Sequence, residues 1–254
     1  MRGLLRGWFS TALAIAWAAG WLAANPVGAA ERIRIGAEDD WRPYSFVVEG
    51  KPVGFAVDLA RAAWAAAGVD VELVPLPYAR CMKEVDNGTL AGCFNTLRDA
   101  RTEDKYRWHK KPLFKARIAI YGRSDATPKG RVDREGLLGA RVGVTNGYDY
   151  GAAFDNDARM LRDVAPSDLV SLRKLVAGRV DYALVFDRVA QEIARVHPEV
   201  GQGFTQRGVL VEPLLYISFT RQKPGLEALI ARFDAGLDKV RQSGEYARIE
   251  ARWK

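Results

Sequence analysis

Short strand patterns and helix patterns alternate along this chain, and the alternation limits the folds open to it. A strand pattern at Arg32–Gly36 is followed by a loop, a helix over about 57–67 and a strand over 71–74. A helix over 78–86 then stops at Asn87-Gly88 and leads into a strand over 90–95. Strands that alternate with helices predict a parallel sheet covered by helices.

The same order of elements starts again in the second half of the chain. A strand over 140–144 leads into the turn Thr145-Asn146-Gly147 and a predicted helix start over 148–154. Residues 174–181 echo residues 83–90, since each segment is a helix end, a glycine and a strand start. The echo predicts two lobes of similar build, and a chance match is an equal explanation for it. Apolar spacing over 226–253 predicts C-terminal core helices.

The first thirty residues have the composition of a secretory signal peptide. Arg2 and Arg6 precede an apolar run over 8–24, and Pro26 and the small residues Ala29-Ala30 follow it. We expect cleavage after Ala30, so that residues 1–30 are removed and the protein functions outside the cytoplasm. The alternative is a permanent membrane anchor, because the apolar run is nearly long enough to span a bilayer.

The charge of the chain limits the class of partner that it can bind. Removing residues 1–30 takes two arginines from the 38 basic residues and none of the 31 acidic ones, which leaves a net charge near +5. The only dense basic run, residues 107–111, fits a solvated face better than a nucleic-acid site.

The two cysteines, Cys81 and Cys93, predict one disulfide in an oxidising compartment. Cys81 lies about 10 Å back from the Asn87-Gly88 turn along the predicted helix, and Cys93 lies about as far along the predicted strand. The two sulfurs are therefore within reach of each other. Two buried free thiols and a redox-active pair are the alternatives, although the pair lacks a close C-x-x-C spacing.

Catalytic signatures are scarce in this sequence. The two histidines, His109 and His197, are far apart, and the nucleophile-elbow and phosphate-loop motifs are absent. We therefore expect no metal, no cofactor and no enzyme activity.

Polar and aromatic residues do follow the predicted strands, where open α/β sheets place their ligands. The candidate ligand-binding residues are Glu38, Trp41, Tyr44, Tyr78, Thr96, Arg101, Asn146, Gly147 and Asp187. An arginine grips a carboxylate, amides at a helix start favour an anion, and a carboxylate suits an ammonium, so the set matches a zwitterion. Each residue also has a plain alternative. Trp41 and Tyr44 also fit as core aromatics. Arg101 also fits as a solvated loop charge like Arg98, and Asp187 as the cap of the helix that follows it.

Taken together, these residues resemble the bacterial extracellular solute-binding proteins of the polar amino-acid type, the family 3 receptors of ABC importers. The resemblance covers residues 33–253. Its motifs are Trp41-x-Pro43-Tyr44-Ser45-Phe46, Gly54-Phe55-Ala56-Val57-Asp58-Leu59, the segment 88–101, the segment 178–187, and the ending Ser243-Gly244-Glu245-Tyr246-Ala247-Arg248-Ile249-x-x-x-Trp253.

The resemblance implies a two-lobed periplasmic-binding-protein fold of type II, in which two α/β lobes close on a ligand. Each lobe would be a mostly parallel sheet flanked by helices, and two hinge strands would join them. Lobe 1 would comprise residues 31–111 and 216–254, lobe 2 residues 116–210, and the hinges about 111–116 and 210–216.

The resemblance also implies roles for the candidate residues. Arg101 and Thr96 would hold an α-carboxylate, Asp187 the ammonium, and Trp41 and Tyr78 the ligand side chain. Asn146 and Gly147 would add backbone donors. The sequence departs from the family at Phe94, which would narrow the pocket, at Arg98, which competes with Arg101, and at Asp149, which puts an anion near the expected carboxylate site.

We therefore expect a periplasmic, monomeric solute-binding protein that captures a small polar metabolite, an amino acid or a related compound, for an ABC permease. The sequence does not identify the ligand. The alternatives are an enzyme similar to periplasmic cyclohexadienyl dehydratase, with Glu38 or Asp149 as the acid if burial raises its pKa, and an accessory or sensory module for a periplasmic partner such as a quinoprotein dehydrogenase.

Overall fold

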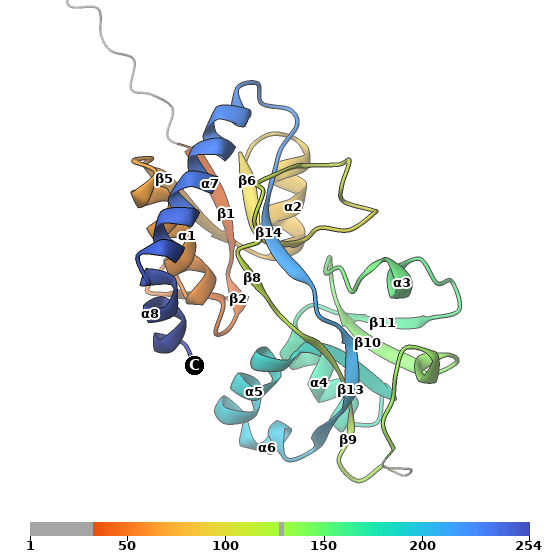
Figure 1. Ribbon diagram of the computed structural model, residues 1–254. Helices are drawn as coiled ribbons and strands as arrows, with labels where there is room; N and C mark the ends of the chain where they lie inside the picture. Colours follow the sequence, from red (N-terminus) through yellow and green to blue (C-terminus); the bar gives the residue numbers. More distant parts are fainter. Residues whose placement is uncertain (1–32, 127–129) are drawn as a thin grey trace, which may run out of the picture. The chain divides into compact units, whose positions relative to one another are not determined.

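Two mixed β-sheets organise the computed structural model, which describes residues 33–126 and 130–254 (Figure 1). The predicted signal peptide, residues 1–30, lies outside the described residues. Within them, no helix combines the length and the apolar character needed to cross a membrane.

The first sheet has the strand order β5-β1-β6-β14-β7, with β8 also paired to β14. Its strands are β1 (Ile33–Glu38), β5 (Val71–Leu76), β6 (Gly92–Leu97), β7 (Arg107–Trp108), β8 (Phe114–Lys115) and β14 (Leu214–Phe219). β1 runs parallel to β5 and β6, whereas β14 runs antiparallel to β6. A small separate sheet joins β2 (Asp40–Trp41), β3 (Ser45–Val48) and β4 (Lys51–Val53).

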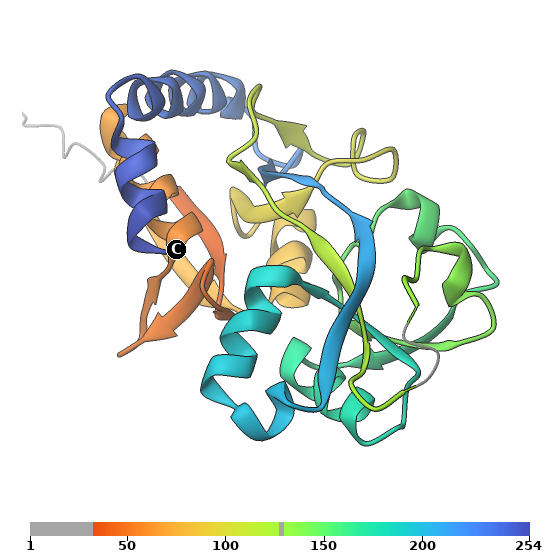
Figure 2. The same ribbon diagram turned by 60° about the horizontal axis from the view of Figure 1, so that its bottom comes forward.

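The helices of the lobe that contains the first sheet are α1 (Phe55–Ala66), α2 (Tyr78–Asp86), α7 (Leu226–Gln242) and α8 (Glu245–Arg252), of which α2 packs on β1 and β6 while α7 and α8 pack on α1. Figure 2 shows α7 and α8, in blue, on the side of this sheet where α1 lies. A methyl group on Gly236 of α7 would stand 2.0 Å from the Ala63 carbonyl oxygen of α1, so only glycine permits this approach of the two helices. The predicted C-terminal core helices are confirmed.

The second sheet has the strand order β11-β10-β12-β9-β13. Its strands are β9 (Ile118–Arg123), β10 (Arg141–Thr145), β11 (Leu161–Ala165), β12 (Tyr182–Phe186) and β13 (Phe204–Val211). Its helices are α3 (Ala152–Asp155), α4 (Asp168–Val176), α5 (Asp187–Val196) and α6 (Pro198–Gly201), with a 3-10 turn at Glu135–Leu137. β10 is parallel to β11 and β12, and β9 is antiparallel to β12 and β13.

Two extended connections join the sheets. The chain leaves the first sheet between β8 and β9 and returns to it between β13 and β14, and these two paths run side by side in Figure 1. The expected two-lobed α/β fold, with a helix-covered sheet in each lobe, is therefore confirmed. The lobe boundaries given above stay a prediction.

One predicted helix begins later than the sequence pattern indicates. The pattern places a helix start at Tyr148, whereas α3 begins at Ala152. Gly147 and Gly151 both have positive φ, 78° and 94°, which interrupts a right-handed helix on either side of Tyr148. The Tyr150 amide then donates to the Asp155 carboxylate at 2.8 Å, which fixes the entry to the short helix.

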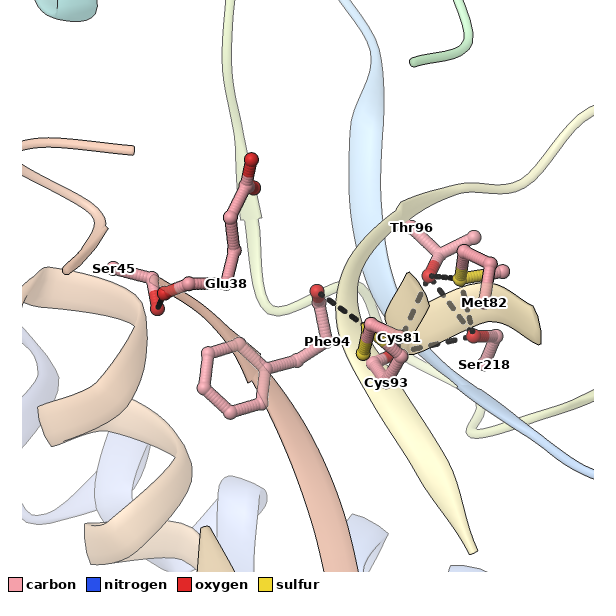
Figure 3. Close-up of a disulfide and its surroundings, with 8 residues drawn as sticks. All are labelled: Glu38, Ser45, Cys81, Met82, Cys93, Phe94, Thr96 and Ser218. Atoms are coloured by element: carbon pink, nitrogen blue, oxygen red, sulfur yellow. Dashed lines mark hydrogen bonds between the residues drawn. A yellow bond between two sulfur atoms is a disulfide. The ribbon is translucent and has the colours of Figure 1, made fainter. Parts of the chain in front are cut away.

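The disulfide predicted between Cys81 and Cys93 is present in the structure. It joins α2 to β6, with a Cα–Cα distance of 6.1 Å, as Figure 3 shows. Gly36 of β1 lies beneath the Cys81 sulfur, because a methyl group there would stand 2.2 Å from it. The disulfide therefore occupies a space that only a glycine in the neighbouring strand leaves free.

Candidate functional site

A small pocket lies where the strand ends of the first sheet face the turn after β10 of the second. Its lining residues are Glu38, Trp41, Tyr78, Asn95, Leu97, Tyr148, Asp149, Phe186 and Leu215. Its cavity volume is about 20 Å³, and one water molecule needs at least about 10–15 Å³. The side chains therefore nearly fill the pocket, and both sheets contribute to its wall.

Glu38 is the buried acid of this pocket. It ends β1, is 5 % exposed, and accepts a hydrogen bond from the Tyr148 hydroxyl. Burial raises the pKa of the Glu38 carboxyl well above its usual range, and the nearby Asp168 adds to the rise, whereas the Tyr148 hydrogen bond opposes it. A carboxyl in this position holds its proton to a higher pH than an exposed one does.

Four aromatic rings form most of the wall. Phe186 packs edge-on to Trp41 at a centroid distance of 4.8 Å, and Tyr78 packs edge-on to Tyr148 at 5.5 Å. Tyr148 and Phe186 lie 6.5 Å apart at 68°. Trp41 of β2 and Tyr78 of α2 belong to the lobe of the first sheet, and Tyr148 after β10 and Phe186 of β12 to the lobe of the second, so the aromatic contacts join the two lobes.

Asn95 is a pocket residue that the sequence reasoning missed. It sits in β6 with a φ of 73°, where the ladder to β14 shifts register between Tyr216 and Ile217. Asparagine tolerates this left-handed conformation better than most residues. Both amide atoms of Asn95 and the Trp41 indole nitrogen are buried without a hydrogen-bond partner among the described residues. A ligand that both donates and accepts would satisfy these groups.

The same register shift turns Thr96 away from the pocket. Its hydroxyl lies 2.9 Å from the Ser218 hydroxyl and 3.3 Å from the Cys93 carbonyl oxygen, and it approaches the Met82 sulfur at 3.6 Å. Figure 3 shows this group beside the disulfide and apart from Glu38. Thr96 therefore packs around the disulfide and also contacts the hydroxyl of the pocket residue Tyr78, but it does not itself line the pocket.

Arg101 is surrounded by aspartates. Its guanidinium contacts the Asp149 carboxylate, lies 2.8 Å from that of Asp155 and 3.7 Å from that of Asp99. Asp149 and Asp155 follow β10, so these ion pairs bridge the two lobes. The competitor considered in the sequence, Arg98, pairs with Glu103 through two hydrogen bonds of 2.7 and 2.6 Å.

Four further candidates stand near the pocket without lining it. Tyr44 stacks between Trp41 and Phe114, at centroid distances of 4.3 and 5.2 Å, and so supports the pocket floor. Asp187 starts α5, where its carboxylate accepts from the Arg188 amide at 2.7 Å and lies 3.6 Å from the Arg117 guanidinium.

Asn146 and Gly147 form the turn after β10 and are exposed. A methyl group on Gly147 would stand 2.7 Å from the Ala79 side chain of α2, so the backbones of the two lobes touch here. Of the predicted residues, the structure thus brings together Glu38, Trp41 and Tyr78. It adds Asn95, Tyr148 and Phe186, whose roles depend on contacts between distant segments.

The pocket wall carries acidic but no basic side chains. Among the described residues, those that line it include no lysine, arginine or histidine, and its ionisable acids are Glu38 and Asp149. Burial raises the pKa of Asp149, and the Arg101 guanidinium opposes the rise. The described part of the chain also brings together no group of histidine, cysteine and carboxylate side chains able to hold a metal ion.

Comparisons with known proteins agree with this architecture. The family model of the bacterial extracellular solute-binding proteins, family 3, matches residues 33–254. A comparison with curated proteins finds no match.

Solved structures show the same fold at low identity. A histidine kinase sensor domain with similarity to periplasmic binding proteins aligns with a TM-score of 0.76 and 24 % identity, over 88 % of this chain and 96 % of that one. The arginine-, lysine-, histidine-binding protein ArtJ from Geobacillus stearothermophilus aligns with a TM-score of 0.74 and 21 % identity, over 88 % of this chain and 95 % of that one. An ancestral arginine-binding protein bound to arginine aligns with a TM-score of 0.73 and 24 % identity, over 87 % of this chain and 97 % of that one.

Proposed function

Because this chain belongs to the bacterial extracellular solute-binding proteins of family 3, we propose that it captures a small polar metabolite between its two lobes and passes it, as a monomer, to an ABC importer. The pocket lined by both lobes carries this proposal. Its buried Asn95 amide and Trp41 indole nitrogen have no partner among the described residues, which favours a polar ligand as the missing partner.

Capture requires the lobes to separate and close again. A cavity of about 20 Å³ admits no metabolite larger than one or two waters, so the ligand enters an open form and the closed form encloses it. Small-angle scattering tests this step. A solute that raises the melting temperature is expected to lower the radius of gyration, and a stabilising solute that leaves the scattering unchanged contradicts the trap.

A thermal-shift panel of amino acids, amines and uncharged polar metabolites tests binding itself, with calorimetry on each positive. Asn95→Gly keeps the left-handed backbone and removes the amide, so affinity is expected to fall about tenfold, as the loss of roughly 1 kcal/mol or more predicts. Asn156→Gly, the same change at an exposed asparagine after α3, is the matched control. Equal affinity in both variants would remove Asn95 from the site.

Export is part of the proposal. The periplasmic fraction of cells that express the full chain should contain a protein whose N-terminus is Glu31. Recovery of the protein in the cytoplasm with Met1 retained would contradict export.

A dehydratase on the same fold is a second candidate, favoured by the raised pKa values of Glu38 and Asp149. A protonated carboxyl can donate its proton to a leaving hydroxyl, which departs as water while the ring carboxylate leaves as CO2 and the electrons of its bond form the new double bond. Incubation with a cyclohexadienyl acid that carries a ring carboxylate, followed by mass spectrometry, tests for the product that has lost water and CO2. A product formed by the wild type and not by Glu38→Gln would replace binding as the function.

A further inference from the structure

The charge of the pocket restricts the solutes that it can accept. Its ionisable acids, Glu38 and Asp149, come one from each lobe, and no cationic side chain joins them on the described wall. A solute carboxylate placed here would lose its water shell without gaining a positive partner. An unpaired buried charge is strongly unfavourable.

The Arg101 guanidinium, which contacts the pocket residue Asp149, is already paired. Arg101 contacts Asp149 and Asp155 and lies within 3.7 Å of Asp99, so three carboxylates surround one positive charge. A solute carboxylate would have to displace aspartates that are tethered to the same chain. The tethered groups bind without the loss of translational freedom that a free solute suffers.

The aromatic wall favours the opposite charge. Trp41 and Phe186 meet at 84°, and Tyr78 and Tyr148 meet at 87°, so neighbouring rings turn their faces in different directions around the pocket. The face of an aromatic ring attracts a cation, most strongly in a site from which water is excluded. Two carboxyl groups beside such rings provide both parts of a cation site.

We infer that this pocket binds a small organic cation without a carboxylate, an amine or ammonium compound, and discriminates against the corresponding α-amino acid. The inference rests on the proposed function and specifies its ligand class. Asp149 and Glu38 are the acidic partners, because a cation beside the buried Glu38 carboxyl favours loss of the proton that burial retains. The four rings line the same pocket, and Asn95 supplies further hydrogen bonds.

Pairs of an α-amino acid and the amine that is the same molecule without its α-carboxylate provide a matched test on the wild-type protein. The pairs are agmatine and arginine, putrescine and ornithine, histamine and histidine, and tyramine and tyrosine, each measured by calorimetry at the same pH. In at least one pair the amine is expected to bind tenfold or more tightly than the amino acid. An amino acid that binds more tightly than its amine overturns the inference and leaves the proposed function intact.

The remaining outcomes are also decisive. If an uncharged metabolite binds and no amine does, the inference fails and the proposed function stands. If no solute of any class binds, both fail.

A charge-removal variant tests the reason for the selectivity. Asp149→Asn combined with Asp155→Asn leaves Arg101 with only the more distant of its three aspartates, Asp99 at 3.7 Å, so the affinity ratio within the best pair is expected to move at least tenfold towards the amino acid. Asp157→Asn is the matched control, because Asp157 pairs with Arg134 and Arg159 and not with Arg101. A ratio that stays the same in the folded double variant overturns the assigned role of the two aspartates.

Discussion

The two sheets solve the same packing problem in different ways. In each, a glycine in the central parallel strand lies opposite a residue of a neighbouring parallel strand: Gly36 of β1 opposite Cys93 of β6, and Gly143 of β10 opposite Ala183 of β12. A helix then packs over that glycine. The nearest helix atom to a methyl group on Gly36 would be the Cys81 sulfur at 2.2 Å, and on Gly143 the Ser171 hydroxyl at 2.5 Å.

The difference lies in what fixes the helix in place. Cys81 and Ser171 each occupy the fourth position of their helix, yet only the first sheet has the cross-link to the facing strand. The cross-linked elements are those that present Tyr78 and Asn95 to the pocket. The two lobes thus pack a helix over a strand glycine in the same way, and the disulfide lies in the lobe where the packed elements carry Tyr78 and Asn95 of the pocket.

The two lobes also differ in their buried ionisable groups. His109 is fully buried beside the first sheet, where its Nε2 accepts from the Ile217 amide at 2.9 Å. Asp168 starts α4 on the second sheet, is 5 % exposed, and accepts from the Thr145 hydroxyl. One is a base held neutral and the other an acid held neutral, so pH should act on the two lobes in opposite directions.

The largest expected effect concerns His109. Burial lowers its pKa from 6.5 to about 3, so the stability it contributes is present above pH 6.5 and is lost as pH falls towards 3, on the order of 5 kcal/mol in full. His109→Gln keeps an acceptor and cannot charge. Urea unfolding at pH 7 and pH 4 should show a smaller loss in the variant than in the wild type. Equal losses would mean that His109 is not the acid-sensitive group.

Asp168 should show the reverse dependence. Burial raises its pKa from 3.8 to about 7, so its contribution is present below pH 3.8 and is lost as pH rises through 7, on the order of 4 kcal/mol. Asp168→Asn keeps the acceptor for Thr145 and removes the charge. The variant should exceed the wild type in unfolding free energy at pH 8 and match it near pH 4. A pH-independent difference would break the contrast between the lobes.

Removing the disulfide tests the covalent difference. The double change Cys81→Ala and Cys93→Ala opens a loop of 12 residues and should lower the free energy of unfolding by roughly 3 kcal/mol. Thiol alkylation and mass spectrometry of the oxidised wild type provide the control, because two alkylatable thiols there would show that the bond does not form. Ligand affinity should fall as well, since Tyr78 and Asn95 then lose their fixed spacing.

The smallest effect distinguishes the two glycines. Gly36→Ala places a methyl group against a sulfur held in a disulfide, whereas Gly143→Ala meets a serine hydroxyl that rotates about one bond. We expect a loss of about 3 kcal/mol for Gly36→Ala and about 1 kcal/mol for Gly143→Ala, the two ends of the range for overpacked cores. Thermal unfolding of both variants measures the difference. Equal losses would show that the disulfide adds no rigidity here.

Local patterns were enough to predict the elements, and long-range contacts decided the pocket. The helix Tyr78–Asp86 appears with the predicted bounds because its apolar spacing and its Asn87-Gly88 stop are both local. The helix start at Tyr148 was wrong, because Gly147 and Gly151 on either side of it both adopt positive φ, which the local apolar pattern does not reveal.

The same limit explains why Asn95 was not among the predicted residues. The register shift that exposes Asn95 to the pocket depends on the partner strand at Tyr216 and Ile217, which no pattern around residue 95 reveals. The sequence indicated one of the two aspartates of the second lobe that pair with Arg101. Asp149 stood out there as a departure from the family, whereas the approach of Asp155 depends on the fold of the turn.

The return of the chain through β14 has a consequence for biosynthesis. Every strand of the second sheet lies between residues 118 and 211, so this sheet is complete before Leu214–Phe219 leave the ribosome or the secretion channel. The first sheet must wait, with β6 presenting an unpaired edge, until its inner strand β14 arrives. Cys81 and Cys93, both made much earlier, can be oxidised during that interval. In the exported protein that we propose, the bond would then hold α2 on β6 while the residues from Leu214 onward are still being delivered, so the oxidant of that compartment would take part in the order of assembly.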